Sequence, residues 1–368
     1  MRILIAPDKF KGSLNAREVA ASIATGLRDV LPDAIIDMVP VADGGEGTAE
    51  AIREACGGEW GSCGAHDALG RRIETRYLWL FDSGKAVIEM SEAAGSRRIA
   101  AHERDLFRAN TFGVSEMMRD ALNRGAREIL LGLGGSATND GGFGMARELG
   151  FRFLAGDREL TNGPADLLNL TRILPVEPPS IQLIAAADVK NPLLGPRGAT
   201  RVFGPQKGGT SDQLDLLERA LARLAEIVSR DLGCDFQELP GAGAAGGLGF
   251  GLASFARATI RRGFDVVAEF IGLRAAIEKA DVVITGEGRL DAQTLEGKAP
   301  AGVASMAKHL GKPVHAIVGA VAELAKANEL FDSITPLVQG ETSHQEALAN
   351  ATALLRDRAR ILASRLVS

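Results

Sequence analysis

The sequence predicts an α/β protein of two domains, in which a five-stranded, doubly wound parallel sheet of the flavodoxin or Rossmann type is interrupted by an inserted mixed α/β domain. Three observations indicate this fold class. The chain opens with short apolar runs alternating with helical patterns, residues 59–90 alternate like antiparallel strands, and the α/β rhythm returns from Asp281. We expect residues 1–62 and 278–368 to form one discontinuous domain and residues 63–277 to form the insertion.

The discontinuous domain is predicted from apolar periodicity and capping residues. Residues 2–6 are apolar on both faces, as in a buried parallel strand, and a helix follows them. Asn15 can cap this helix, with Glu18 completing a capping box, or Ser13 can be the cap. The other expected elements are strands at 35–41, 281–285, 314–318 and 334–338, and helices at 46–56 and near 298–310, 321–328 and 343–366.

The insertion begins with the antiparallel pattern, which turns at residues 82–85. Longer helical and apolar segments follow it. We expect strands at 128–133 and 181–187, and helices at 111–124, from about Asn139, at 212–231 and after the glycine-rich stretch 240–251.

Composition excludes several classes of protein. The 368 residues are 46% hydrophobic and 24% charged, which is ordinary for a globular protein. The net charge of −5 without a basic block argues against a nucleic-acid or membrane-surface partner. The three cysteines (Cys56, Cys63 and Cys234) are odd in number and lack metal-like spacing, which indicates a reducing compartment. Without a signal-peptide pattern or a long apolar run, the chain is expected to be cytoplasmic.

Four segments combine glycines with acids, amides and hydroxyls, and each follows a predicted strand. They are APDKFKGS (6–13), VADGGEGT (41–48), GLGGSATNDGG (132–142) and TGEGRLD (285–291). Ligands of doubly wound sheets bind at the carboxyl ends of strands where the strand order reverses, which we expect between the loops of Asp8 and Glu287. Glycines let N–H groups approach an anion, while carboxylates and lysines hold metal ions and phosphates. These segments indicate phosphoryl transfer to a small polar acceptor.

The first two loops each have an ordinary structural explanation as well. The loop of Asp8 carries Lys11 near a predicted helix N-terminus, which suits an anion, but it would also suit a solvated βα loop. Asp43 and Glu46 precede another helix, with Thr48 in its first turn. These acids suit Mg²⁺, or they complement the helix dipole at an ordinary helix entry.

The third segment contains a competing motif. Residues 132–137 read GxGxxA after a predicted strand, with Asp157 about twenty residues further on, which matches a dinucleotide-binding fingerprint. The polar residues 138–142 and the turn-like sequence around Asp157 argue against it. We instead expect anion binding, as phosphate or carboxylate, by backbone and side-chain donors of Gly134, Gly135, Ser136, Thr138 and Asn139.

Three further residues are candidates with equally plausible structural roles. Asp188 ends an apolar strand, where a carboxylate can accept the proton of an attacking hydroxyl or cap the turn before Pro192. Lys207 lies in a glycine-containing loop, and Lys298 opens a predicted helix; either can bind phosphate or be a solvated lysine. No Walker A sequence and no GxSxG elbow are present.

Seven collinear segments carry a resemblance that extends over essentially the whole chain: APDKFKGSL, PVADGGEGT, GLGGSATNDGG, ADVKNPL, FGPQKGG, PGAGAAGG and VVITGEGRLD. In this order they resemble the type I glycerate kinase family of bacteria. The resemblance implies ATP- and Mg²⁺-dependent phosphorylation of D-glycerate, usually at the 2-hydroxyl, in a cleft between two α/β domains. The segment 90–95 departs from the plainer alanine-rich run of such proteins, and its Glu92 would alter the fit of the acceptor if it lined the cleft.

For that activity, the sequence gives hypothetical roles to its charged residues. Asp43 and Asp291 are the expected metal ligands, with Glu287 as an alternative to Asp291. Asp188, or failing it Asp8, would accept the hydroxyl proton. The remaining candidates are cations for the phosphates (Lys11, Lys207 and Lys298) and acceptor-binding residues (Ser13, Glu287 and Arg289).

Alternatives stay open at this point. The 3-hydroxyl of glycerate could be the acceptor, the GxGxxA loop could belong to an NAD-dependent 2-hydroxy-acid oxidoreductase, or the chain could be an anion sensor without catalysis. The expected partners are the small molecules ATP and D-glycerate; a homodimer is one possible assembly, and the sequence leaves the oligomeric state open.

Overall fold

The computed structural model describes residues 1–81, 83–291, 298–322, 328–340 and 342–367. The chain groups into two compact units. The terminal unit comprises Met1–Asp43, Glu50–Cys56 and Phe264–Ser368, and the central unit comprises Gly44–Ala49 and Gly57–Gly263. The division expected from the sequence, at 62/63 and 277/278, stays a prediction, and residues 264–277 group here with the terminal unit.

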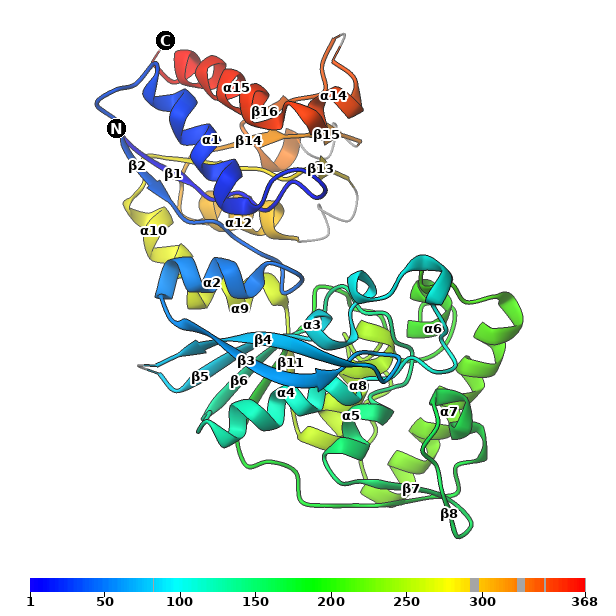
Figure 1. Cartoon of the computed structure of the whole chain (residues 1–368). Coiled ribbons are helices and arrows are strands. Elements are labelled where there is room, and N and C mark those ends of the chain that lie inside the picture. Colours follow the sequence, from blue (N-terminus) through cyan, green and yellow to red (C-terminus); the bar gives the residue numbers. More distant parts are fainter. Residues whose placement is uncertain (82, 292–297, 323–327, 341, 368) are drawn as a thin grey trace. The chain divides into compact units, whose positions relative to one another are not determined.

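The terminal unit contains a five-stranded parallel sheet (Figure 1). Its order is β16 (Ser333–Pro336), β14 (Val314–Val318), β12 (Val282–Thr285), β1 (Arg2–Ile5) and β2 (Ile35–Met38). The chain passes from β1 to β2 on one side and resumes with β12 on the other side of β1. This order confirms the predicted doubly wound sheet, with its reversal between β1 and β12.

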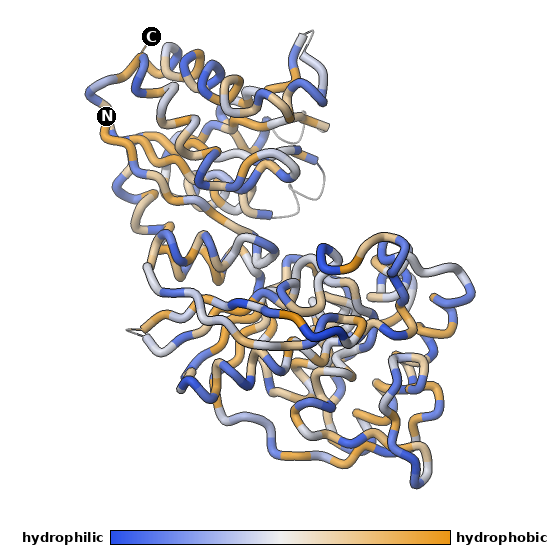
Figure 2. Tube along the Cα trace, viewed as in Figure 1, coloured by the Kyte–Doolittle hydropathy of each residue, from blue (hydrophilic) through white to orange (hydrophobic). Residues whose placement is uncertain are grey.

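Helices cover both faces of this sheet. Figure 1 shows α1 (Ala16–Arg28) and α15 (Ala351–Leu366) side by side on one face, and α10 (Leu273–Lys279) and α12 (Ala299–His309) on the other. Figure 2 shows the apolar character of the strands between these layers. A Cβ at Gly26 would collide with the Arg356 carbonyl, so α1 and α15 pack backbone against backbone at that point.

The helix ends follow local sequence rules. The Asn15 side chain accepts a hydrogen bond from the Glu18 N–H, and the Glu18 carboxylate accepts one from the Asn15 N–H, each at 2.9 Å, which confirms the capping box. The single helix expected at 343–366 is divided into α14 (His344–Ala349) and α15, because Asn350 leaves helical geometry at φ −111° and ψ 22°. The helix expected at 321–328 falls mainly on 323–327, outside the described residues.

The central unit has a six-stranded mixed sheet. Its order is β11 (Thr259–Arg261), β10 (Gln182–Ala186), β6 (Glu128–Gly132), β5 (Lys85–Glu89), β4 (Arg72–Leu80) and β3 (Glu59–His66). Strands β5, β6, β10 and β11 are parallel, so their carboxyl ends share one edge. Strands β3, β4 and β5 are antiparallel, as the alternation in residues 59–90 predicts.

Short and long helices complete the central unit. They are α3 (Ser91–Ala94), α4 (Phe112–Asn123), α5 (Phe143–Glu148), α6 (Ala199–Phe203), α7 (Ser211–Leu232) and α8 (Ala244–Ala256), with 3₁₀ turns η1 (Ser96–Arg98) and η4 (Pro205–Lys207). Helix α2 (Thr48–Cys56) begins in the central unit and continues in the terminal unit. Among the helices of the described ranges, none combines the length and apolar composition needed to cross a membrane.

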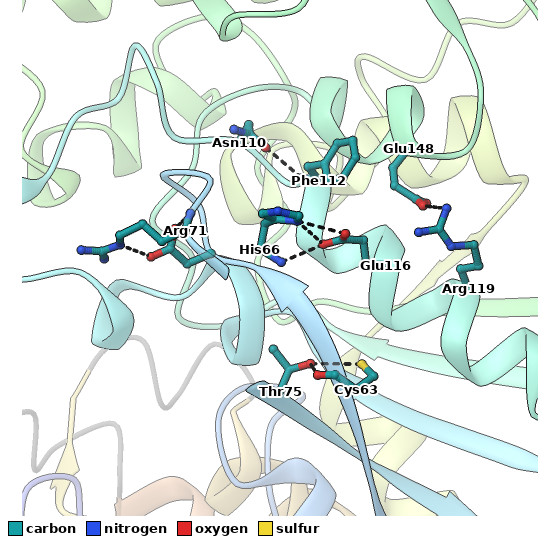
Figure 3. Close-up of polar contacts among 10 residues, drawn as sticks. Cys63, His66, Arg71, Thr75, Asn110, Phe112, Glu116, Arg119 and Glu148 are labelled. Atoms are coloured by element: carbon teal, nitrogen blue, oxygen red, sulfur yellow. Dashed lines mark hydrogen bonds and ion pairs between the residues drawn. The ribbon is translucent and has the colours of Figure 1, made fainter. Parts of the chain in front are cut away.

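A polar contact joins the β3–β4 hairpin to α4. Figure 3 shows the ring of His66 facing Glu116, with its Nδ1 3.0 Å from both carboxylate oxygens. The backbone N–H of His66 also donates to Glu116 at 2.7 Å, and the ring meets Phe112 edge-on. A Cβ at Gly113 would collide with the His66 carbonyl, so this close approach requires glycine. The pair therefore fixes the start of α4, which leads to the glycine loop described below.

Candidate functional site

Three loops of the terminal unit meet at the carboxyl edge of its sheet. The Asp8 N–H donates to the Gly286 carbonyl at 2.8 Å, and the Val41 N–H donates to the Pro7 carbonyl at 2.9 Å. A Cβ at Gly288 would lie 3.2 Å from the backbone nitrogen of Lys11. The loops after β1, β2 and β12 are therefore bound to one another, as the predicted reversal of strand order requires.

Carboxylates and lysines act on one another at this edge. Burial, and second the negative charge of Asp43, raise the pKa of Asp8 to about 7. Lys9 and Lys298 oppose this shift by their positive charges, and the Lys9 N–H donates to Asp8 at 2.6 Å. Asp8, Asp43 and Lys298, distant in sequence, thus lie within electrostatic reach of one another.

The TGEGRLD segment is held as a short strand. β13 (Arg289–Leu290) pairs with β15 (Ala320–Val321), and the Glu287 carbonyl accepts a hydrogen bond from the Gly319 N–H at 2.9 Å. Arg289 is exposed, whereas Glu287 and Asp291 are half-buried. The structure thus places these acids on the loop next to that of Asp8.

The other predicted site residues of the terminal unit differ in exposure and in whether their side chains are bonded within the fold. Lys11 is exposed, and Lys298 stands at the N-cap of α12 as expected. Ser13 uses its hydroxyl within the fold, donating to the Leu348 carbonyl at 2.9 Å. Within the described ranges, no three His, Cys, Asp or Glu side chains form a metal-binding group.

In the central unit, the glycine loop 133–142 follows β6 and has an accessible half. Gly135 is exposed and left-handed at φ +74°, and Gly134 and Ser136 are half-buried. Ser96 binds two carbonyls of this half: its N–H donates to the Gly135 carbonyl and its Oγ to the Ser136 carbonyl, each at 2.9 Å. The N–H groups of Gly134, Gly135 and Ser136 donate to no group in the described part of the chain. They are available to an anion.

The second half of the loop is buried. Thr138, Asn139 and Asp140 have 0% exposure. The Asp140 carboxylate accepts four hydrogen bonds of 2.8–3.1 Å, from the Thr111 N–H and hydroxyl and from two glycine N–H groups of the loop and α5. Burial raises the pKa of Asp140, and these bonds oppose the shift. Helix α5 begins only at Phe143, later than expected, because the two preceding glycines are left-handed.

Sequence reasoning missed Glu89, which organises the VADGGEGT segment. Its carboxylate is 5% exposed and accepts hydrogen bonds from the N–H groups of Gly47 and Ala49 at 3.0 and 2.9 Å. A Cβ at Gly134 would lie 2.5 Å from the Gly45 Cα, so this segment packs directly on the glycine loop. The start of α2 is therefore capped by Glu89. An acid at the carboxyl end of a buried strand was the available signal.

Asp188 follows β10, the neighbour of β6. The Leu133 N–H donates to the Ala186 carbonyl at 3.1 Å, which joins the two strand ends. Asp188 is half-buried. The structure thus brings the candidate base and the glycine loop to the same edge of the central sheet.

Comparison with known proteins agrees with these motifs. A family model described as Glycerate kinase family matches residues 3–367. The chain belongs to the glycerate kinase family. It is 39% identical to glycerate kinase of Bacillus subtilis (strain 168), with 99% of this chain and 97% of that protein covered. It is 41% identical to glycerate 2-kinase of Escherichia coli (strain K12), with 88% and 86% covered.

A solved structure shows that the fold is shared as well. A crystal structure described as that of glycerate kinase 2 from Salmonella typhimurium LT2 matches with a TM-score of 0.88 at 40% identity. The match covers 100% of this chain and 98% of that one. The similarity in fold therefore extends along the whole chain.

The departure at Glu92 from the run expected for a glycerate kinase has a structural explanation. Glu92 is 8% exposed and forms ion pairs with Arg97, with Arg98 at 2.8 Å and with Arg76 at 3.7 Å. The Arg76 guanidinium also lies over the Trp60 ring at 4.2 Å. The carboxylate is thus enclosed by arginines that stabilise α3 and η1.

The dinucleotide fingerprint lacks its structural context in this member of the family. Residues 133–142 separate β6 from α5, whereas the fingerprint requires a helix directly after the glycines. Asp157 lies in the turn between the antiparallel strands β7 (Arg152–Ala155) and β8 (Arg158–Glu159), instead of ending a parallel strand. The hairpin-like sequence around Asp157 predicted this turn.

Proposed function

We propose that this chain phosphorylates D-glycerate with ATP and Mg²⁺ and forms 2-phospho-D-glycerate. Family membership and the names of the relatives support glycerate as the acceptor. The name of the Escherichia coli relative, glycerate 2-kinase, favours the 2-hydroxyl over the 3-hydroxyl. The observation that carries the proposal in this chain is the row of available N–H groups at Gly134, Gly135 and Ser136.

These N–H groups suit the binding of phosphate oxygens. Phosphoryl transfer depends on positioning and on neutralising negative charge, with little covalent work by the protein. Ser96 holds the carbonyls of Gly135 and Ser136. Because the C=O and N–H of a planar trans peptide point in opposite directions, the Ser136 N–H points away from Ser96. The loop thus offers the positive ends of its peptide dipoles to the phosphate oxygens, and it does so with rigid backbone groups instead of a flexible charged side chain.

The acids of the terminal unit suit Mg²⁺. Asp43 raises the pKa of Asp8 by its negative charge, so two carboxylates that repel each other are held together. Mg²⁺ is usually bound by one or two carboxylates together with substrate phosphates and water, so a larger ligand group is not required. We assign Asp43, with Asp291 or Glu287, as the residues that would hold it. When bound, the ion supplies charge neutralisation for the phosphates.

Cations and a base complete the proposed set. Lys11 and Lys298 would balance charge on the β- and γ-phosphates, and exposed Arg289 would pair with the glycerate carboxylate. Asp188 and Asp8 are alternative acceptors for the hydroxyl proton. A pKa of about 7 suits Asp8 for this role near neutral pH. The variants Asp188→Asn and Asp8→Asn separate these alternatives. The variant that lacks the base should lose kcat and still bind ATP, whereas the other should keep most of its kcat.

Product analysis tests the proposed function. The protein is incubated with ATP, Mg²⁺ and D-glycerate, and the phosphorylated position is identified by ³¹P NMR. We expect the resonance of 2-phosphoglycerate and its dependence on both ATP and glycerate. Formation of 3-phosphoglycerate would overturn the regiochemistry, and the absence of any phosphoester would overturn the kinase. An absorbance change of added nicotinamide cofactor would instead support the oxidoreductase.

A further inference from the structure

Lys207 is a buried cation whose place in the fold differs from that of a solvent-facing phosphate ligand. It ends η4, and its side chain is 5% exposed. Lysine is almost never buried to this degree without a partner. Burial lowers the pKa of Lys207 to about 7, and the charge of Asp140 opposes this shift. The fold therefore bears a desolvation cost to keep an amine at this position.

The partner of Lys207 is the backbone of the glycine loop. Its Nζ donates to the Thr138 carbonyl at 2.6 Å, in a fully buried contact. The preceding helix α6 adds a second contact one residue further on, where the Asn139 amide donates to the Thr200 hydroxyl at 3.0 Å. The α6–η4 segment thus binds the loop at two consecutive residues.

The opposite side of the Thr138 carbonyl is closed by the start of α8. Ala245, Gly246 and Gly247 are all left-handed, with φ of +53°, +68° and +88°. A Cβ at Gly246 would collide with the Thr138 oxygen, and the Gly246 carbonyl accepts a hydrogen bond from the Gly141 N–H at 3.0 Å. Three successive left-handed residues, one of them alanine, are strained and persist only where surrounding contacts enforce them.

We propose that Lys207 is a positioning residue. Its hydrogen bond to the Thr138 carbonyl holds the loop and so fixes the direction of the N–H groups at Gly134–Ser136. Only Ala137 separates Thr138 from the accessible half of the loop, and its N–H is bound to the Ala94 carbonyl at 2.9 Å. With both ends of this short stretch fixed, its peptide planes have little freedom. The proposal rests on the proposed function for the claim that the loop binds phosphate. The hydrogen bond from Lys207 that holds the loop does not depend on that function.

The test compares Lys207→Met with Lys308→Met. Lys308 is a matched control because its Nζ also donates to a backbone carbonyl, that of Glu329 at 2.7 Å, at an exposed site in the terminal unit. Lys207→Met is expected to fold, since Asp140 keeps its four hydrogen bonds. If it does not fold, Lys207→Arg keeps the charge and an N–H donor for the Thr138 carbonyl, but with a broader head that fits the buried contact less well.

Amide hydrogen exchange of the ligand-free protein gives the decisive readout. We expect Lys207→Met to speed exchange at Ala137 and Gly141, whose N–H groups are bonded on either side of Thr138, by at least about tenfold, equivalent to about 1.4 kcal/mol of local stability, with β5 and β6 unchanged. We expect kcat to fall by a similar factor, with partial recovery in Lys207→Arg. Lys308→Met should change neither quantity.

Three results would overturn the proposal. Unchanged loop exchange together with a raised KM for ATP would make Lys207 a direct phosphate ligand. Faster exchange throughout the central unit, with normal kcat for the folded fraction, would reduce Lys207 to a general stabilising residue. If loop exchange and kcat were unchanged in both Lys207→Met and Lys207→Arg, Lys207 would have no positioning role. Because exchange is measured without substrates, absence of kinase activity would defeat the proposed function, but the effect of Lys207 on the loop could still be measured.

Discussion

The two sheets of this molecule treat charge at their carboxyl edges in opposite ways. In the terminal unit, Asp8 and Asp43 repel each other, and Asp8 keeps a pKa of about 7. In the central unit, the buried acids Glu89, Glu92 and Asp140 are each enclosed by hydrogen-bond donors or arginines. Carboxylates whose charges shift one another's pKa are typical of a functional site, whereas acids bonded to several donors hold the backbone in place. The contrast supports the proposed division of roles, in which the terminal edge holds Mg²⁺ and the central edge supplies N–H donors.

The largest expected effect comes from removing a charge at the terminal edge. Asp43→Asn should lower kcat/KM by about 10²- to 10³-fold, as loss of an electrostatic group at a transition state does in other enzymes. Steady-state kinetics over a range of Mg²⁺ concentrations measure it. Asp37→Asn is the control, because Asp37 lies on β2 just before this loop and pairs with Arg2 at 2.6 Å. Equal effects of the two substitutions would contradict the assignment.

At the central edge, Glu89→Ala should act mainly on stability. It leaves the buried N–H groups of Gly47 and Ala49 without their acceptor, which costs about 1–3 kcal/mol for each unsatisfied group. Denaturant unfolding measures the loss. Glu89→Gln keeps an acceptor oxygen and should lose clearly less. If the alanine and glutamine variants were equally stable, the cap would not hold the loop.

A smaller effect is expected from Ser96→Ala, which releases the Ser136 carbonyl. One hydrogen bond of this kind contributes about 1 kcal/mol, so affinity for ATP should fall by about fivefold. Ser364→Ala removes a similar hydroxyl-to-carbonyl bond in the exposed part of α15 and serves as the control. Titration calorimetry compares the two. An unchanged affinity in Ser96→Ala would show that the loop needs no help from this side chain.

The last prediction is a pH-dependent shift in melting temperature for Asp8→Asn. Because the folded protein holds the Asp8 proton up to about pH 7 while the unfolded chain releases it near the usual value of 3.8, the wild type loses stability as pH rises between these values. Asparagine does not titrate, so the variant should gain relative to the wild type from pH 5 to pH 8. Calorimetry at several pH values measures this difference. A difference that stays constant with pH would mean that Asp8 is not held in a repulsive, buried setting.

The sequence predicts what depends on local pattern. The sequence patterns located every strand of the terminal sheet and all strands of the central sheet except β11, and the Asn15–Glu18 spacing predicted a capping box that is present. The loops of Asp8 and Glu287 were expected at the reversal of strand order, which lies between β1 and β12. These features require only neighbouring residues and the connectivity of parallel strands.

Features that depend on contacts distant in sequence could not be predicted in this way. Glu89 binds N–H groups forty residues away, and Lys207 reaches a carbonyl 69 residues away. Ser13 was expected at a substrate, a prediction that stays untested, and its hydroxyl is bound to Leu348. A short motif shows which residue types are present, whereas burial and hydrogen-bond partners are set by the fold.

The most direct test is the amide NMR signals of Gly134, Gly135 and Ser136 in selectively ¹⁵N-labelled protein. We predict that a non-hydrolysable ATP analogue with Mg²⁺ and D-glycerate shifts these signals downfield, as N–H groups do when they bind phosphate oxygens. Under the proposed function, Asp43 holds the Mg²⁺ that accompanies the nucleotide, so the same addition to the Asp43→Asn variant should shift these signals much less. Signals that stay unchanged in the wild type under saturating nucleotide would contradict the account.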